Sequence, residues 1–182
     1  MNKAVFLDRD GTIIKDEGYL RDPDSVCFLQ GAIEALKDLM TAGYMLVLVS
    51  NQSGVGRGYF SEDSVMKVHE RIKEILAREG VVLDGIYYCP HAPEEACECR
   101  KPSPGMILRA AKELKIDLSK SVMIGDKQSD LDAGSAAGCG CSLILKNDCV
   151  RSEEHGRLVF GSLSEAVRFI LSDDRKKSKS RK

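Results

Sequence analysis

Short apolar segments of this chain end in polar residues that could do chemistry together. Residues 4–7 lead into Asp8 and Asp10, residues 45–49 into Ser50, and residues 122–124 into Asp126. Three acids at two neighbouring strand ends would repel one another unless a cation neutralised them, and Mg²⁺ accepts carboxylate and carbonyl oxygens. One carboxylate could attack phosphorus, while a second protonates the leaving oxygen and later activates water. The spacing therefore predicts phosphoryl transfer, with Lys101 offsetting charge on the transferred group.

Cys89, His91, Cys97 and Cys99 form a second group within eleven residues. Three thiolates and one imidazole satisfy tetrahedral Zn²⁺ and leave no open position, which is typical of a structural site. In a reducing compartment such a cluster favours a metal over disulfides. We therefore expect a zinc-binding loop. The alternative is that these are ordinary buried cysteines beside a surface histidine.

The remaining cysteines and histidines match no functional pattern. Cys139 and Cys141 have no histidine nearby and lead into an apolar segment, so we expect them in the core. His69 and His155 are expected at the surface.

The elements that position these groups alternate along the chain. Apolar runs typical of buried parallel strands occupy residues 4–7, 45–49, 85–88, 122–124 and 142–145. Between them, apolar residues at three- to four-residue spacing predict helices over residues 33–40, 65–76 and 106–114. This alternation indicates an α/β fold with a doubly wound, Rossmann-like parallel sheet. Ligands of such sheets bind where the strands end, which is where the acids lie.

Composition limits the function classes. The 182 residues carry a net charge of −1, and the last ten, 173–182, contain six basic and two acidic residues. Residues 1–172 thus hold 21 basic against 26 acidic residues, which argues against nucleic-acid binding. The sequence has no membrane-spanning run and no secretory signal, so we expect a cytoplasmic protein. We predict one domain over residues 1–172 and a disordered basic tail over residues 173–182.

The segments FLDRDGT, VSNQSG, CRKP and GDKQSD, in this order, resemble the four motifs of the haloacid dehalogenase (HAD) superfamily phosphatases. The resemblance implies that Asp8 is the nucleophile that becomes an aspartyl phosphate and that Asp10 is the general acid and base. Ser50 and Lys101 would stabilise the phosphoryl group. Magnesium would be held by Asp8, the Asp10 carbonyl and Asp126, with Asp130 as a supporting acid.

Larger members of that superfamily carry a cap domain after the first motif or between the second and third. Only about twenty residues separate Asp10 from Gly31, and one helix, one strand and the cysteine loop fill the interval from Ser50 to Lys101. We therefore expect a capless enzyme with an open site shaped by loops.

A capless fold with a zinc loop resembles two families, the D-glycero-D-manno-heptose 1,7-bisphosphate 7-phosphatases and the histidinol-phosphate phosphatases. The segments DEGYLRDPD, SNQSGVGRGYF, DGIYYCPH and CRKPSPGM favour the heptose family. That likeness implies an enzyme of nucleotide-activated heptose biosynthesis, acting on a small sugar bisphosphate. Nothing in the sequence requires an assembly larger than a monomer, which is the state we expect. Arg100 would hold the phosphate that is not hydrolysed. The implied substrate contacts are Asp16, Glu17, Gly18, Tyr19, Ser50, Asn51, Gln52, Ser53, Arg100, Lys101 and Lys127. Histidinol-phosphate phosphatase remains the alternative activity, and a non-catalytic zinc-loop binding module is the alternative of another class.

Overall fold

The central sheet is built around the first strand of the chain. The computed structural model describes residues 1–146, 152–154 and 157–179. Within these residues seven strands form one sheet in the order β3-β2-β1-β4-β5-β7-β6, in which only β6 runs antiparallel to its neighbour. The strands are β1 (Lys3–Leu7), β2 (Tyr44–Asn51), β3 (Gly85–Cys89), β4 (Val122–Gly125), β5 (Cys141–Leu145), β6 (Ser152–Glu154) and β7 (Arg157–Phe160).

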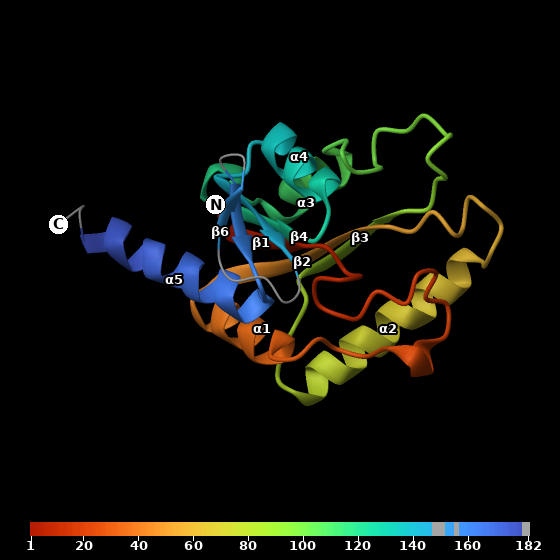
Figure 1. Ribbon diagram of the computed structural model, residues 1–182, viewed down its shortest axis with the longest axis horizontal. Helices are drawn as coiled ribbons and strands as arrows, with labels where there is room; N and C mark the ends of the chain where they lie inside the picture. Colours follow the sequence, from red (N-terminus) through yellow and green to blue (C-terminus); the bar gives the residue numbers. More distant parts are fainter. Residues whose placement is uncertain (147–151, 155–156, 180–182) are drawn as a thin grey trace.

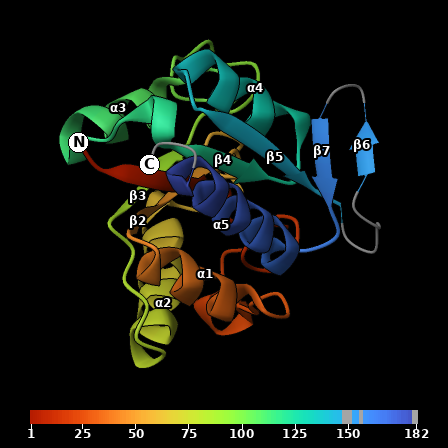
Figure 2. The same cartoon turned by 90° about the vertical axis from the view of Figure 1, so that its left-hand side faces the viewer.

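Helices cover both faces of the sheet (Figures 1 and 2). They are α1 (Ala32–Thr41), α2 (Glu62–Arg78), α3 (Gly105–Leu114), α4 (Gln128–Ala137) and α5 (Leu163–Lys179), with short 3₁₀ turns at Pro23–Ser25 and Leu118–Lys120. The side chains of β1 point alternately to the two faces of the sheet. Val5 and Leu7 pack with α1, α2 and α5, whereas Ala4 and Phe6 pack with α3 and α4. All four are fully buried, so the doubly wound α/β fold is confirmed.

The predicted strands and helices are all present, but the structure adds elements that apolar spacing did not reveal. In α4 the sequence QSDLDAGSAA has Leu131 as its one large apolar residue, so the helix lacks a periodic apolar stripe. In α5 the buried residues end at Ile170, so the second half of the helix shows no apolar pattern.

The prediction of a disordered tail after Ser172 is wrong as far as Lys179, because α5 continues to that residue. Lysine and arginine are good helix formers and interact favourably with the helix dipole near a C-terminus. Asp174 is also anchored, since its carboxylate accepts hydrogen bonds from Lys3 Nζ at 2.9 Å and from the Tyr44 hydroxyl at 2.7 Å. The domain boundary expected at residue 172 therefore falls inside a helix. Residues 180–182 lie outside the described residues.

The intervals expected to lack a cap domain contain no extra domain. Residues 11–31 hold only the turn Pro23–Ser25, and residues 52–100 hold α2, β3 and the cysteine loop. Across the described ranges, every helix is too short or too polar to cross a membrane.

Candidate active site

The ends of β1, β2 and β4 meet because these strands are parallel neighbours. Asp8 directly follows β1, and its backbone amide donates to the carbonyl of Ile124 at 2.9 Å. Gly11 then turns the chain with φ of 77°, and an added Cβ there would lie 2.5 Å from Asp126 Oδ2. The loop after β1 can therefore rest against Asp126 only because residue 11 is glycine.

Three carboxylates gather at this point, and Asp130 stands in the cluster where strand-end reasoning expected the Asp10 side chain. Asp8, Asp126 and Asp130 each offer an oxygen, and these oxygens lie within 4.8 Å of one another. Lys101 Nζ contacts Asp8 Oδ1 at 2.5 Å and Asp130 Oδ1 at 2.6 Å, and donates to the Val49 carbonyl at 2.7 Å. Burial alone would lower the pKa of Lys101, but the two carboxylates outweigh it and raise that pKa. Lys101 is therefore a cation that neutralises part of the cluster.

Asp126 is the acid that Lys101 does not reach. Its Oδ1 is buried and has no hydrogen-bond partner among the described residues. Burial, together with the nearby charge of Asp8, raises the pKa of Asp126 to about 6. An unpartnered, buried carboxylate oxygen beside a second carboxylate is the environment that suits a hard divalent cation.

The carboxylate of Asp10 is held by hydrogen bonds from Arg9 and Gln52. Its Oδ2 accepts from Arg9 Nη2 at 2.9 Å and from Gln52 Nε2 at 3.1 Å. Burial raises the pKa of Asp10, while the charge of Arg9 opposes this rise. A carboxyl group with a raised pKa at the cleft wall can donate a proton to a leaving group. Sequence reasoning predicted the role of Asp10 and missed Arg9, whose side chain is the largest among the fully buried residues described.

The side-chain amides of Asn51 and Gln52, at the end of β2, form hydrogen bonds with other residues of the active site. Asn51 Nδ2 donates to the Lys101 carbonyl, and the Lys101 amide donates to Asn51 Oδ1, both at 3.0 Å. Gln52 Nε2 also donates to Ser50 Oγ at 2.7 Å. Asn51 and Gln52 line the cleft, where substrate contacts were predicted, yet their amide groups are engaged in positioning Lys101, Asp10 and Ser50.

A cleft of about 570 Å³ opens above these groups. Two predicted substrate contacts do not line it: Glu17 is exposed, and Ser50 is buried. Lys127 contacts Asp16 across it at 3.4 Å. The predicted residues on its wall are Asp10, Asp16, Gly18, Tyr19, Asn51, Gln52, Ser53, Arg100, Lys101 and Lys127. Gly54, Pro102 and Ser129 also line it; they lie within the quoted motifs but were not among the predicted substrate contacts.

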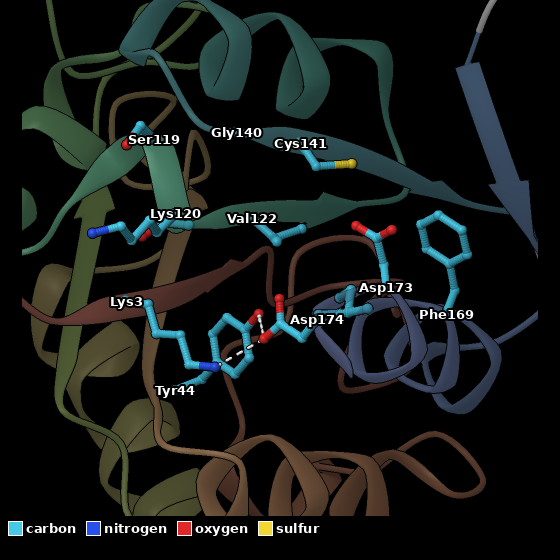
Figure 3. A pocket seen from close by; sticks show the side chains of 12 residues that line it. Lys3, Tyr44, Ser119, Lys120, Val122, Gly140, Cys141, Phe169, Asp173 and Asp174 are labelled. Carbon is cyan, nitrogen blue, oxygen red and sulfur yellow. Dashed lines mark hydrogen bonds and ion pairs between the residues drawn. The ribbon is translucent and has the colours of Figure 1, made fainter. Parts of the chain in front are cut away.

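Another cavity, of about 370 Å³, lies between α5 and the amino ends of β1 and β2 (Figure 3). Its lysines are paired with carboxylates, Lys3 with Asp174 and Lys120 with Asp117, both at 2.9 Å. It is remote from the carboxylate cluster, which lies at the carboxyl ends of the strands. We therefore place the chemistry in the cleft beside Lys101.

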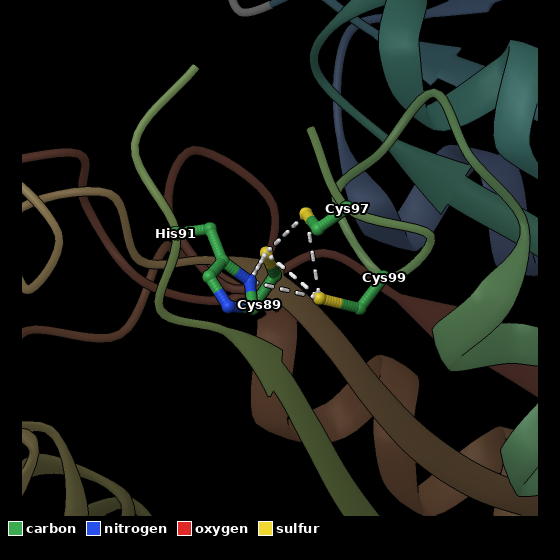
Figure 4. A group of neighbouring side chains, drawn as sticks. All are labelled: Cys89, His91, Cys97 and Cys99. Atoms are coloured by element: carbon green, nitrogen blue, oxygen red, sulfur yellow. Dashed lines mark hydrogen bonds between the residues drawn. The ribbon is translucent and has the colours of Figure 1, made fainter. Parts of the chain in front are cut away.

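The cysteine loop brings its four predicted ligands together (Figure 4). Cys99 Sγ lies 3.1 Å from Cys89 Sγ, 3.6 Å from Cys97 Sγ and 3.3 Å from His91 Nδ1. Zinc–sulfur bonds of about 2.3 Å imply tetrahedron edges of roughly 3.5–3.8 Å. The two edges to Cys97 Sγ, at 3.6 and 3.7 Å, match this range, and the three edges among Cys89, His91 and Cys99, at 3.1–3.4 Å, are shorter. Cys139 and Cys141, expected in the core, are half-buried and pack against it.

The two histidines outside the loop have different outcomes. The expectation that His69 lies at the surface is wrong. Its side chain is 5% exposed, on the face of α2 that contacts Arg9. Its position could have been found, because it lies on the apolar stripe of α2 with Val65, Ile72 and Leu76. His155 lies outside the described residues.

Comparisons with known proteins agree with the site. Residues 98–166 match the hydrolase family described as HAD-hydrolase-like. The chain is 52% identical to the D-glycero-beta-D-manno-heptose-1,7-bisphosphate 7-phosphatase of Haemophilus influenzae, over 80% of this chain and 83% of that protein. It is 42% identical to the D-glycero-alpha-D-manno-heptose-1,7-bisphosphate 7-phosphatase of Burkholderia mallei, over 79% and 80%.

A solved structure is similar over nearly the whole chain. It is the D,D-heptose 1,7-bisphosphate phosphatase of B. bronchiseptica complexed with magnesium and phosphate, with a TM-score of 0.83 and 31% identity over 94% of this chain and 99% of that one. The catalytic carboxylates, the capless fold and these relatives agree. The chain therefore belongs to the heptose-1,7-bisphosphate 7-phosphatase family of HAD-like phosphatases.

Proposed function

We propose that this chain removes the 7-phosphate of D-glycero-D-manno-heptose 1,7-bisphosphate, in the cytoplasm and as a monomer, to supply nucleotide-activated heptose. The observation that carries the proposal is the contact of Asp8 with Lys101 in a cleft whose wall also presents Arg100 and Lys127. Lys101 serves the reacting phosphate, and Arg100 and Lys127, the latter in contact with Asp16 at 3.4 Å, supply positive charge for a second anionic group. All these residues come from one chain, and the free cysteines are consistent with a reducing compartment.

The reaction follows from the positions of two carboxylates. Asp8 attacks phosphorus, the bond from phosphorus to the sugar oxygen breaks, and Asp10 gives its proton to that oxygen. Asp10 then takes a proton from water, which attacks the aspartyl phosphate and releases inorganic phosphate and free Asp8. Lys101 and Ser50 stabilise the charge on the transferred oxygens.

Two metal ions complete the proposal. Asp8, Asp126 and the Asp10 carbonyl would hold magnesium, which supplies positive charge to the reacting phosphoryl group when bound. The unpartnered Asp126 Oδ1 supports this assignment. Cys89, His91, Cys97 and Cys99 would hold a structural zinc, supported by their near-tetrahedral spacing.

Arg100 is proposed to bind the phosphate that is retained. Its Nη1 donates to the His91 carbonyl at 3.3 Å, so the metal loop fixes one side of the guanidinium while the residue lines the cleft. Arg100→Ala should lower kcat/KM for the heptose bisphosphate, with a loss of about 2–4 kcal/mol of transition-state stabilisation, because a charge-assisted pair loses one partner. For p-nitrophenyl phosphate, which has no second phosphate, the same change should matter much less.

A matched control is Arg57→Ala, since Arg57 pairs with Glu94 beside the same loop and does not line the cleft. It should leave kcat/KM unchanged for both substrates. If Arg100→Ala lowered both rates by the same factor, Arg100 would not read a second phosphate.

A substrate panel tests the identity of the sugar. Both anomers of the heptose bisphosphate and histidinol phosphate would be compared with and without Mg²⁺. We expect the highest kcat/KM for one heptose anomer, and relatives named for either anomer make both arms necessary. Faster hydrolysis of histidinol phosphate would favour the alternative activity. Absence of Mg²⁺-dependent phosphate release from every substrate would favour a non-catalytic module.

A further inference from the structure

Arg9 is a buried cation directly beneath the active site. Its side chain is 0% exposed, and Nε lies 3.1 Å from both carboxylate oxygens of Asp10 while Nη2 lies 2.9 Å from Oδ2. Gln52 Nε2 is a further donor to Oδ2, at 3.1 Å. Oδ2 thus accepts from three N–H groups, whereas Oδ1 accepts from one among the described residues. Oδ1 is therefore the oxygen with room for a proton.

The same guanidinium also orients Gln52. Arg9 Nη2 donates to Gln52 Oε1 at 2.9 Å, which directs the Gln52 amide nitrogen toward Asp10 and toward Ser50 Oγ. A planar fork can satisfy a carboxylate and an amide oxygen simultaneously, which a lysine ammonium on a flexible stem cannot reproduce. One side chain thereby fixes both the acid and the partner of the active-site hydroxyl.

His69 completes the arrangement on the far side of Arg9. Its Nε2 lies 3.4 Å from Arg9 Nη1, and its ring meets the ring of Tyr88 edge-on at 5.5 Å. Burial, followed by the charges of Arg9 and Lys73, lowers the pKa of His69 to about 3. The imidazole is thus neutral, and Nε2 can accept a hydrogen bond from Arg9 Nη1 while Nδ1 carries the ring proton.

We propose that Arg9 and His69 form a positioning pair that holds the Asp10 carboxyl with Oδ1 as its proton-exchanging oxygen. This inference rests on the proposed function, in which Asp10 protonates the leaving oxygen. Neither residue lines the cleft, and Arg9 acts on it through its contacts with Asp10 and Gln52. Loss of the pair should therefore impair proton donation while substrate binding persists.

Two model substrates isolate the proton-donation step. The leaving group of p-nitrophenyl phosphate departs without a proton, whereas the alkoxide leaving group of p-nitrobenzyl phosphate requires one. Positioned acid catalysis contributes about 10²–10⁴-fold. Arg9→Met should lower kcat/KM, which reports the steps up to departure of the leaving group, about 100-fold for the benzyl ester and less than about tenfold for the phenyl ester.

Variants of His69 provide a second route that leaves Arg9 in place. His69→Leu removes the acceptor and should lower kcat/KM for the benzyl ester about tenfold, and His69→Gln, whose amide oxygen can accept, should restore most of it. Arg71→Met is the matched control on α2, because Arg71 is a half-buried arginine of the same helix that pairs with Glu74. It should leave both esters unaffected.

The pair would be refuted by equal losses of kcat/KM for the two esters in Arg9→Met and His69→Leu, or by an unchanged kcat/KM for the benzyl ester in folded variants. Melting temperature and zinc content are measured for each variant, so that general damage is recognised. The proposed sugar substrate can fail without affecting this contrast, since neither ester contains a sugar. If Arg9→Met does not fold, the difference between His69→Leu and His69→Gln decides the matter.

Discussion

Asn51 joins the end of β2 to the backbone of Lys101 through both atoms of its side-chain amide. Asn51→Ala should let the Lys101 segment shift and lower kcat about 10- to 100-fold, with KM changed less than about threefold. Steady-state kinetics with p-nitrophenyl phosphate measure both parameters.

The comparison is with Ser53→Ala, because Ser53 lines the same cleft and was predicted to contact substrate. That change should act mainly on KM. If Asn51→Ala raised KM and spared kcat, Asn51 would bind substrate directly, as its motif alone suggested.

His69 makes the stability of the fold depend on pH. Its pKa falls from 6.5 in the unfolded chain to about 3 in the folded one, so below pH 6.5 the unfolded state binds a proton that the folded state does not. Its contribution is fully present above pH 6.5 and is lost as the pH falls toward 3. At pH 4.5 this loss is about 2–3 kcal/mol, at 1.36 kcal/mol for each pH unit below 6.5.

Urea denaturation of the wild type and His69→Gln at pH 7.5 and pH 4.5 checks this expectation, since the other titrating groups cancel in the difference. The variant should gain stability relative to the wild type at the lower pH. Equal differences at both values would mean that His69 is protonated in the folded protein.

At the scale of elements, the cysteine loop connects the Cys89–His91–Cys97–Cys99 cluster to the substrate cleft. Cys99 directly precedes Arg100, and the Gly56 amide of the loop after β2 donates to the Pro90 carbonyl at 2.8 Å. Cys97→Ser should release one zinc per chain and raise KM for the bisphosphate, while Asp8 and Asp126 keep their positions. Metal analysis and kinetics on the same preparation measure both effects.

Cys27→Ser is the control for that prediction, because Cys27 is an exposed thiol outside the loop. It should retain zinc and activity. Freshly reduced wild-type protein without zinc would contradict the metal assignment.

The sequence was most informative where local patterns decide the outcome. Continuous apolar runs predicted β1 to β5, and strand ends predicted the meeting of Asp8, Asp126 and Lys101. Contacts across the chain were beyond such patterns. The burial of Arg9 depends on Gln52, which lies 43 positions away, and on His69, 60 positions away. A charged residue between two acids gives no local sign that its side chain turns inward.

At the scale of the whole molecule, α5 ties the end of the chain to its beginning. Asp174 contacts Lys3 and Tyr44 at the amino ends of β1 and β2, opposite the active site. Deleting residues 173–182 should lower the free energy of unfolding by about 1 kcal/mol, since the ion pair is partly solvated, and leave kcat unchanged. Chemical denaturation and kinetics test the two parts.

Asp174→Asn in the full-length chain separates the anchoring contact from the rest of the tail. It should reproduce much of the loss. A truncated protein as stable as the wild type would show that the last turns of α5 contribute nothing to the fold.

The central position of β1 also has a consequence for synthesis on the ribosome. β1 is the first strand to emerge, and it can pair with β2 early, but its other neighbour is β4, which begins only at Val122. At roughly 5–20 residues per second, the second edge of β1 waits on the order of ten seconds for its partner. The nascent chain thus exposes an apolar strand edge throughout that interval, when a chaperone or premature pairing with another chain competes for it.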